Sequence, residues 1–204
     1  MPEPIRYELL APRPPDEGPI DLSAVGGGAG PLELDIGFGR GMSLFARAEC
    51  APHNRLLGIE IKAKWATKVE RRRQRLGLDK VTVWAGDART ILRRCGPEGI
   101  VARTFVHFPD PWWKKRHQKR RVLQPSFLDT LARLTAAGGE LFVQTDVPER
   151  HELYHRTVAN HPAFEVLSAE LDHNPFGAVS NRERRAEEDG LPIYRLLARR
   201  RPRP

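Results

Sequence analysis

The fold is decided by the stretch LELDIGFGRG, residues 32–41. Its first five residues form a short apolar run of the kind that a buried strand shows. Gly37, Gly39 and Gly41 follow at alternate positions, and they predict a turn whose backbone can approach a ligand closely. Residues 42–50 then read as a helix. A strand, a glycine turn and a helix in this order predict the first unit of an α/β domain.

The same alternation continues along the chain. Further strands are expected at 55–60, 81–84, 100–108 and 140–144, with helices at about 62–76, 87–94 and 124–136 between them. A helix at 149–160, a strand at 164–169, a glycine-containing linker and a last strand at 192–198 complete the chain. This order predicts a Rossmann-like, doubly wound, mostly parallel sheet of seven strands with right-handed crossovers. Ligands of such sheets bind outside the carboxyl ends of the strands.

The length of 204 residues fits one domain, which we assign to residues 31–204. Residues 1–30 carry six prolines and the run GGGAG, so we expect a flexible arm there rather than core structure. The N-terminus has no secretory pattern, and no apolar run approaches the length of a membrane span. Cys50 and Cys95 lack a metal-type spacing and are interpreted as reduced thiols. We therefore expect a cytoplasmic protein.

The chain is basic, with 34 Lys and Arg against 26 Asp and Glu and a net charge of +8. Such a charge indicates a polyanionic partner, although it does not choose between a nucleic acid, a membrane surface and a phosphorylated ligand.

A second stretch is more specific and reads TFVHFPDPWWKKRHQKRR, residues 104–121. Asp110 lies between two prolines, which restrict the backbone on both sides of it and so hold its carboxylate in place. Trp112, Trp113 and six Lys or Arg follow, a mixture that suits stacking on bases and neutralising phosphates. The plainer interpretation is a strand followed by a solvated charged loop.

Acidic residues follow each of the first five predicted strands, or end them: Asp35, Glu60, Asp87, Asp110 and Asp146. Glu60 comes about twenty residues after the glycine turn, where a carboxylate can accept both hydroxyls of a ribose. Asp87 alone is also explained as a helix N-cap. The whole set indicates a cofactor that contains a nucleoside.

Two such cofactors compete, a nicotinamide dinucleotide and S-adenosyl-L-methionine. A diphosphate needs a G-x-G-x-x-G turn at a helix N-terminus, whereas this turn is G-x-G-x-G and follows the negative charge of Asp35. That charge suits the ammonium group of S-adenosylmethionine better. The step Gly86-Asp87-Ala88 would then contact adenine.

With these motifs in view, the sequence resembles the bacterial tRNA (guanine-N7)-methyltransferase family of class I S-adenosylmethionine-dependent methyltransferases. The resemblance covers nearly all of residues 32–200. It depends on the motifs DIGFG (35–39), GIE (58–60), GDA (86–88), FPDPW (108–112) with its basic tail, QTD (144–146) and PIY (192–194).

The resemblance implies methyl transfer from S-adenosylmethionine to N7 of a guanine in the variable loop of tRNA, at position 46 of the tRNA. It implies cofactor contacts at Asp35, Gly37, Gly39, Glu60, Asp87, Ala88 and Asp110. It implies substrate contacts at Lys114, Asp146 and a C-terminal motif, Ser180-Asn181-Arg182-Glu183. The family often has glutamate at the place of Asp35, and its C-terminal motif usually reads Thr-Lys-Phe-Glu. The altered motif favours one alternative, a catalytically idle RNA-binding module; a nicotinamide oxidoreductase is another.

Guanine N7 has an exposed lone pair, so its methylation needs no prior removal of a proton. We therefore expect orientation of the base to dominate catalysis, with Asp110 near the developing charge and Glu183 and Asp146 accepting hydrogens from the guanine. The seven histidines, His107 and His117 among them, form no convincing metal pattern, and a metal-free reaction is expected. The expected partner is tRNA, and the expected state is a monomer or homodimer.

Overall fold

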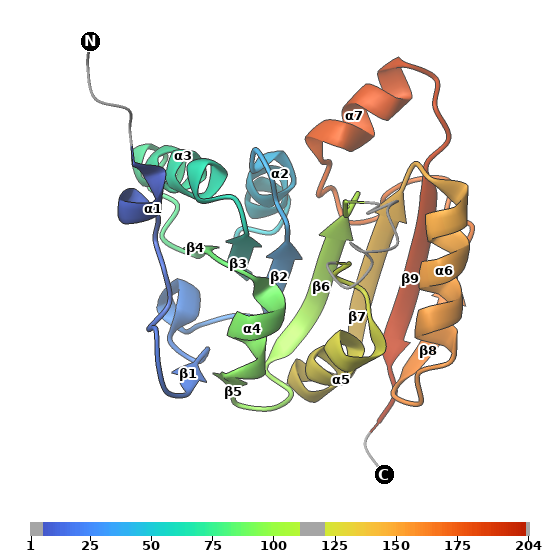
Figure 1. The fold of residues 1–204 in the computed structure, drawn as a ribbon, viewed down its shortest axis with the longest axis horizontal. Coiled ribbons are helices and arrows are strands. Elements are labelled where there is room, and N and C mark those ends of the chain that lie inside the picture. The colour runs from blue at the N-terminus through green and yellow to red at the C-terminus, as the bar shows by residue number, and fades with distance from the viewer. Residues whose placement is uncertain (1–5, 111–120, 203–204) are drawn as a thin grey trace.

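The computed structural model describes residues 6–110 and 121–202. In this part of the chain, seven strands form one sheet in the order β4-β3-β2-β6-β7-β9-β8, with β9 antiparallel to its neighbours and the other pairs parallel (Figure 1). The strands are β2 (Leu32–Ile36), β3 (Arg55–Glu60), β4 (Val81–Ala85), β6 (Val101–His107), β7 (Thr135–Thr145), β8 (Phe164–Ser168) and β9 (Tyr194–Arg200). The predicted mostly parallel sheet is confirmed.

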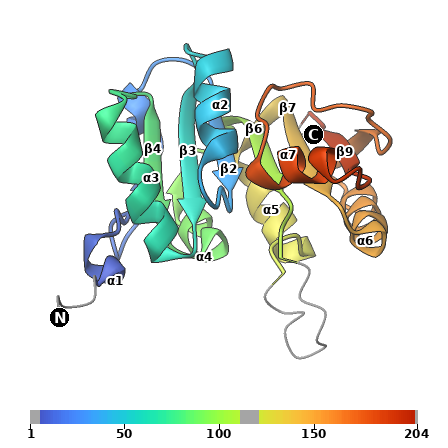
Figure 2. The same ribbon diagram turned by 90° about the horizontal axis from the view of Figure 1, so that it is seen from above.

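The helices lie on both faces of the sheet (Figures 1 and 2). They are α2 (Met42–Cys50), α3 (Ala63–Arg75), α4 (Ala88–Arg93), α5 (Pro125–Leu134), α6 (Pro148–Ala159) and α7 (Asn181–Glu188). Helices α4, α5 and α6 cover one face, and α2 and α3 cover the other. Helix α7 lies beyond the carboxyl ends of β6 and β7 (Figure 1).

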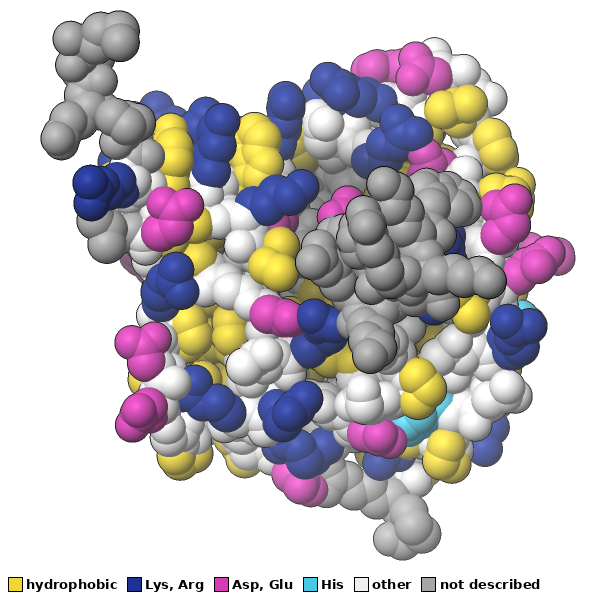
Figure 3. Space-filling view, viewed as in Figure 1, with side chains coloured by type: hydrophobic (Ala, Val, Ile, Leu, Met, Phe, Trp, Pro, Cys, Tyr) yellow, Lys and Arg dark blue, Asp and Glu magenta, His cyan; other side chains and the backbone are white. Residues whose placement is uncertain are grey.

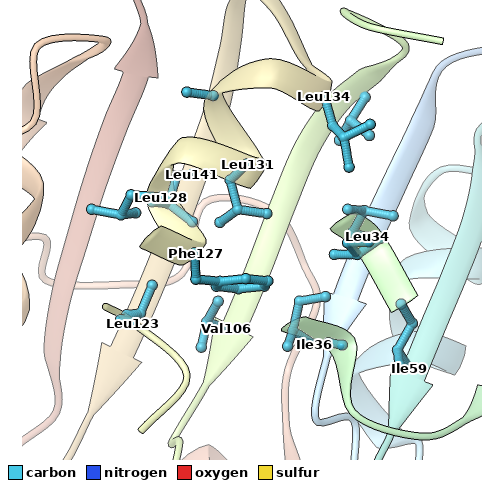
Figure 4. Close-up of a cluster of buried hydrophobic side chains, with 14 of the residues drawn as sticks. Leu34, Ile36, Ile59, Val106, Leu123, Phe127, Leu128, Leu131, Leu134 and Leu141 are labelled. Atoms are coloured by element: carbon cyan, nitrogen blue, oxygen red, sulfur yellow. The ribbon is translucent and has the colours of Figure 1, made fainter. Parts of the chain in front are cut away.

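The larger core lies under α5. Phe127, Leu128, Leu131 and Leu134 recur at helical spacing and pack on apolar side chains of β2, β3, β6 and β7 (Figure 4). All four are at most 2% exposed. Full burial of one such side chain contributes about 1.5–3 kcal/mol, so this stripe fixes the sheet from which the strand ends project.

On the other face, α2 comes very close to the sheet over Gly58. A Cβ added to Gly58 would lie 2.6 Å from Phe38 Cδ1 and 2.9 Å from Leu44 Cδ2. Because residue 58 is a glycine, Phe38 of the glycine turn and Leu44 of α2 can pack directly against β3. This contact sets where the glycine turn after β2 projects.

The N-terminal segment is packed rather than free. It contains α1 (Tyr7–Leu10), the 3-10 helix η1 (Val25–Gly27) and β1 (Ile20–Asp21), which pairs in parallel with β5 (Cys95–Gly96). Ile20 and Leu22 belong to the main core, and the guanidinium of Arg94 donates to the carbonyls of Pro15, Asp16 and Gly18.

The expectation that residues 1–30 contribute no core structure is therefore wrong for this described part. The prolines and glycines set the path of the segment, and its few apolar side chains anchor it. How the chain divides into an arm and a domain stays a prediction.

The predicted linker between β8 and β9 contains a helix, α7. Ser180 accepts a hydrogen bond from the Glu183 amide and the Glu183 carboxylate accepts one from the Ser180 amide, a capping box that starts the helix. The spacing S-x-x-E was the signal for this helix in the sequence.

Candidate functional site

A cavity of about 350 Å³ opens outside the carboxyl ends of the parallel strands. Five segments and Val122 line it: the segments are the glycine turn with the start of α2, the end of β3 with the start of α3, the turn after β4, the end of β6, and the start of α7. Its size is in the range of pockets that hold small ligands. The position is the one that the sequence predicts.

The glycine turn forms one wall of this cavity. Gly37, Gly39 and Gly41 have φ angles of 77°, 56° and 78°, a backbone region that side chains with a Cβ rarely adopt. The turn is tied to β3, because the Gly37 amide donates to the Ile59 carbonyl and the Gly39 amide to the Glu60 carboxylate. The turn is therefore held in shape before any ligand arrives.

Glu60 ends β3 at the wall of the cavity. Its Oε2 accepts the Gly39 amide at 2.9 Å and its Oε1 accepts the Lys62 amide at 2.8 Å. The side chain is 5% exposed, so two backbone hydrogen bonds fix its orientation. Each carboxylate oxygen can accept a further hydrogen bond, and the pair is suited to two neighbouring hydroxyl groups.

Asp35 lies beneath the glycine turn and is not itself a lining residue. Its Oδ2 accepts a hydrogen bond of 2.6 Å from Ser43, which does line the cavity. Its Oδ1 is buried and has no hydrogen-bond partner among the described residues. Burial raises the pKa of Asp35 to about 7; the Ser43 hydrogen bond opposes this rise and the charge of Glu60 adds to it. A buried carboxylate oxygen without a partner is costly unless a ligand supplies one.

Asp87 is both an N-cap and a lining residue. It caps α4 by accepting the Arg89 amide at 3.0 Å, so the structural explanation of this residue is confirmed. It also pairs with the Arg89 guanidinium. Burial acts to raise the pKa of Asp87, but the hydrogen bonds from Arg89 and the nearby arginine charges outweigh it and lower the pKa. Gly86 and Ala88 line the cavity on either side of it.

Asp110 lies at the mouth of the cavity, lines it and is exposed. The chain reaches it through Phe108, whose φ of 46° is unusual for a residue other than glycine and costs conformational energy. The Phe108 amide donates to the Gln144 carbonyl at 2.8 Å, which holds this bend against β7. Lys114 lies outside the described residues, as do Trp112, Trp113 and the basic residues up to position 120.

His107 lines the cavity, a position that the sequence did not predict for it. Gln144 Nε2 lies 2.8 Å from His107 Nδ1 and donates to Glu183 at 2.7 Å. Because the amide uses one hydrogen for each, the network assigns Nδ1 as an acceptor and the ring proton to Nε2. Nε2 is buried and has no partner in the described part of the chain. Burial lowers the pKa of His107 to about 4, against the charge of Glu183.

The C-terminal motif is split by the structure. Ser180, Asn181 and Arg182 line the cavity. Glu183 does not; it is 1% exposed and accepts hydrogen bonds from the Ser180 amide, Gln144 and Asn174, and it pairs with Arg195. Its geometry is that of a residue that holds other side chains in place.

Asp146 is also occupied. It pairs with Arg182, whose Nε lies 2.8 Å from Asp146 Oδ2 and whose second nitrogen contacts the same oxygen. Asp146 is not among the lining residues, whereas Arg182 is.

Ser43, Arg40 and Trp65 also line the cavity and were not predicted as site residues. Ser43 could have been found from its place on the first turn of the helix behind Asp35. Arg40 lies inside the glycine turn. Trp65 has the spacing of a core residue in the sequence, and only the fold brings it to the cavity.

The described residues contain no group of three or more His, Cys, Asp or Glu that could hold a metal ion. Within the same part of the chain, no helix is long and apolar enough to cross a membrane.

A mostly parallel seven-stranded sheet with one antiparallel strand, and a cavity built from a glycine turn and successive strand-end carboxylates, define a methyltransferase of the Rossmann-like class I type. A family profile described as "Putative methyltransferase" matches residues 29–196. Among solved structures, the 16S rRNA methyltransferase KamB aligns with a TM-score of 0.60 at 19% identity, over 85% of this chain and 89% of its own. A putative methyltransferase from Streptococcus mutans, solved in complex with SAH, aligns with a TM-score of 0.55 at 11% identity, over 84% of this chain and 88% of its own.

Sequence relatives are more specific. The tRNA (guanine-N(7)-)-methyltransferase of Synechococcus sp. (strain JA-3-3Ab) is 36% identical over 199 residues, which cover 97% of this chain and 83% of the relative. The chain belongs to the tRNA (guanine-N(7)-)-methyltransferase family.

Proposed function

We propose that this protein transfers a methyl group from S-adenosyl-L-methionine to N7 of a guanine in tRNA, in the variable loop. The observation that carries the proposal is the buried Oδ1 of Asp35, which has no partner among the described residues and lies beneath the glycine turn of the cavity. The name of the relatives supports the substrate. The cytoplasm is the proposed compartment, and a monomer or homodimer stays the expected state.

The residues present fit the cofactor. Asp35 would hold its ammonium group, because a cation supplies the partner that Oδ1 lacks and favours the ionised carboxylate. Glu60 would accept the ribose hydroxyls, with Gly37 and Gly39 letting the chain of the cofactor pass close to the backbone. Asp87 and Ala88 would contact the adenine. When bound, S-adenosylmethionine supplies a methyl group on a positively charged sulfur.

The chain's own residues would then act by holding the base. N7 carries a lone pair and needs no general base, so orientation is the main contribution, and a well-oriented pair of reactants gains about 7–11 kcal/mol at most. The exposed Asp110 carboxylate, at the mouth of the same cavity, would stabilise the positive charge that the base acquires. Ser180, Asn181 and Arg182 would contact the nucleotide from α7, and Lys114 with its basic neighbours would bind phosphates.

The test is methyl transfer to unmodified tRNA by Asp110→Ala and Asp110→Asn. Both variants should lose about 100-fold or more in kcat/KM, since each removes the charge. Asp79→Ala, an exposed aspartate outside the cavity lining, is the matched control and should retain wild-type activity. Wild-type rates in Asp110→Ala would remove this residue from the site.

The same assay with the wild-type protein distinguishes an active methyltransferase from an idle RNA-binding module. Transfer of labelled methyl to a guanine of tRNA supports the proposal. Binding of tRNA without any transfer, under conditions in which calorimetry shows S-adenosylmethionine binding, would instead identify an idle RNA-binding module.

A further inference from the structure

We propose that the exposed face of α3 is an RNA-binding surface that contacts phosphates of the tRNA, in addition to the basic residues proposed for this role at 114–121. The inference rests on the proposed function, because it takes tRNA as the partner. We call this surface the α3 ridge and define it as Lys64, Lys68, Arg71, Arg72 and Arg75.

The α3 ridge follows from the amphipathic pattern of the helix. Ala66 and Val69 are buried against β3 and β4, whereas every member of the ridge is exposed. Apart from the consecutive pair Arg71 and Arg72, the members are three or four residues apart, so neighbours along the ridge stand about 5–6 Å from each other at their Cβ atoms. The ridge runs from the first turn of the helix to its last.

Structural contacts explain only part of the ridge: Arg72 Cζ lies 4.5 Å from the ring centre of Phe45, whereas ion pairs do not account for the other cations. The ion pair that α3 does contain joins Glu70 to Arg73, which is not a ridge residue. Within the described residues, no member of the ridge forms an ion pair. Like charges four residues apart, as in Lys64 with Lys68 and Lys68 with Arg72, destabilise a helix. Lys64 also lies in the first turn, where the helix dipole disfavours a cation. Only the arginines of the last turn are favoured by the dipole.

The ridge is continuous with the cavity. Trp65 is half-buried and lines the cavity, and three cations surround its ring: Arg40 Cζ at 5.1 Å, Lys68 Nζ at 5.4 Å and Lys64 Nζ at 5.9 Å from the ring centre. Lys and Arg side chains gather along the upper edge of the molecule, over α3 and toward α7 (Figure 3). An RNA whose base enters the cavity would therefore pass its backbone over a row of cations beside an aromatic ring, the combination that binds single strands.

The same cations could in principle attract an anionic membrane. A helix that binds a membrane surface presents an apolar face to it, together with the cations. The apolar face of α3 is turned into the core, and the exposed side of the helix is charged. Ile61 and Leu76 are exposed next to the two ends of α3, but the ridge between them is charged, so its chemistry favours the phosphates of a nucleic acid over a bilayer.

The experiment measures the salt dependence of tRNA binding by the full chain. The double variant Lys64→Gln/Lys68→Gln should bind unmodified tRNA more weakly than wild type at low salt. The slope of log affinity against log salt is negative, and its magnitude should decrease by about 1.4–1.8, the value for two lost phosphate contacts. The control is Arg156→Gln/Arg199→Gln, which removes the same charge from exposed residues on α6 and β9. The magnitude of its slope should decrease by much less.

Affinity for S-adenosylmethionine, measured by calorimetry, should equal that of wild type in both variants, which excludes damage to the cavity. An unchanged slope in Lys64→Gln/Lys68→Gln, or an equal decrease in the control, would overturn the proposal. Loss of binding to phosphatidylglycerol vesicles with an unchanged tRNA slope would also overturn it and assign the ridge to a membrane. These binding measurements do not depend on methyl transfer. Failure of the proposed function would be seen separately, because the wild-type protein would then bind tRNA but transfer no methyl group to it.

Discussion

The two sides of the cavity differ in how fully the polar groups in and behind their walls are already bonded. On the side of β2 and β3, Glu60 is fixed by two backbone amides and can accept more, and Asp35 keeps one buried oxygen without a partner among the described residues. On the side of β7 and α7, Glu183 accepts several hydrogen bonds and an arginine, and Asp146 is paired with Arg182.

This difference separates a preorganised half from one that has to rearrange. A ligand meets fixed acceptors on the first side and loses little in ordering them. On the second side a carboxylate can reach a guanine only after it gives up a partner. The comparison predicts that Asp35 acts on the cofactor directly, that Glu183 acts by holding α7 in place, and that Asp146 becomes available only when its pair opens.

The largest effect is expected at Glu183. In Glu183→Ala the buried Arg195 loses its nearer and buried carboxylate partner and keeps the exposed carboxylate of Glu187 at 3.6 Å; breaking a buried pair costs about 3–5 kcal/mol. For a domain of this size that lowers Tm by roughly 6–20 °C. Thermal melting by circular dichroism measures it, with Glu188→Ala on the same helix as an exposed control that should change Tm little. An unchanged Tm together with a raised KM for tRNA would show that Glu183 contacts the substrate after all.

The sequence predicted most of the fold for a physical reason. The strands are short apolar runs and the amphipathic helices between them repeat every three to four residues, so local pattern and final burial agree. The segment around Ile20 and Leu22 was missed because its structure depends on packing against distant residues, through Arg94. The start of α7 was visible in the capping-box spacing, but the place of the helix over the cavity depends on the distant partners of Glu183, which are Gln144 and Arg195.

The candidate site was predicted unevenly for a related reason. A carboxylate at a strand end is visible in the sequence, as Glu60 and Asp87 show. Whether that carboxylate faces the cavity or an internal partner is set by side chains from other elements. The sequence therefore placed Glu183 with Ser180 in one motif, whereas the structure turns one into the protein and the other toward the cavity.

The next effect in size concerns the preorganised half. Asp35→Asn keeps the shape but removes the charge, and a hydrogen bond to a charged group contributes about 1.5–3 kcal/mol. The Kd for S-adenosylmethionine should therefore rise by roughly 10- to 150-fold, measured by calorimetry at pH 8. Ser23→Ala, which changes an exposed side chain far from the cavity lining, is the control. An unchanged Kd would mean that the free oxygen of Asp35 does not face the cofactor.

The pH dependence of stability gives a second measure of Asp35. Its pKa is raised from 3.8 to about 7 in the folded protein, so the folded state binds a proton more tightly than the unfolded state. Its contribution is fully present below about pH 4 and is lost as the pH rises to about 7. Relative to wild type, Asp35→Asn should therefore gain stability across this window and show a constant difference above it. Comparing the two proteins cancels the other titrating groups, His107 among them. A difference that does not change between pH 4 and 7 would contradict the raised pKa.

The smallest effect on stability is expected for the pair of Arg182 and Asp146, on the side of β7 and α7. Arg182 is 47% exposed, and pairs of that exposure contribute at most about 1 kcal/mol, so Arg182→Ala should lower Tm by only a few degrees. The same change releases Asp146 while it removes one cation from the cavity wall. If Asp146 is the group that binds the guanine, the KM for tRNA should rise less in Arg182→Ala than in Asp146→Ala. Lysine in place of Arg182 keeps the charge without the forked geometry and serves as the matched variant. Equal KM values in Arg182→Ala and Asp146→Ala would show instead that the pair works as one unit, and that this half of the cavity is as preorganised as the other.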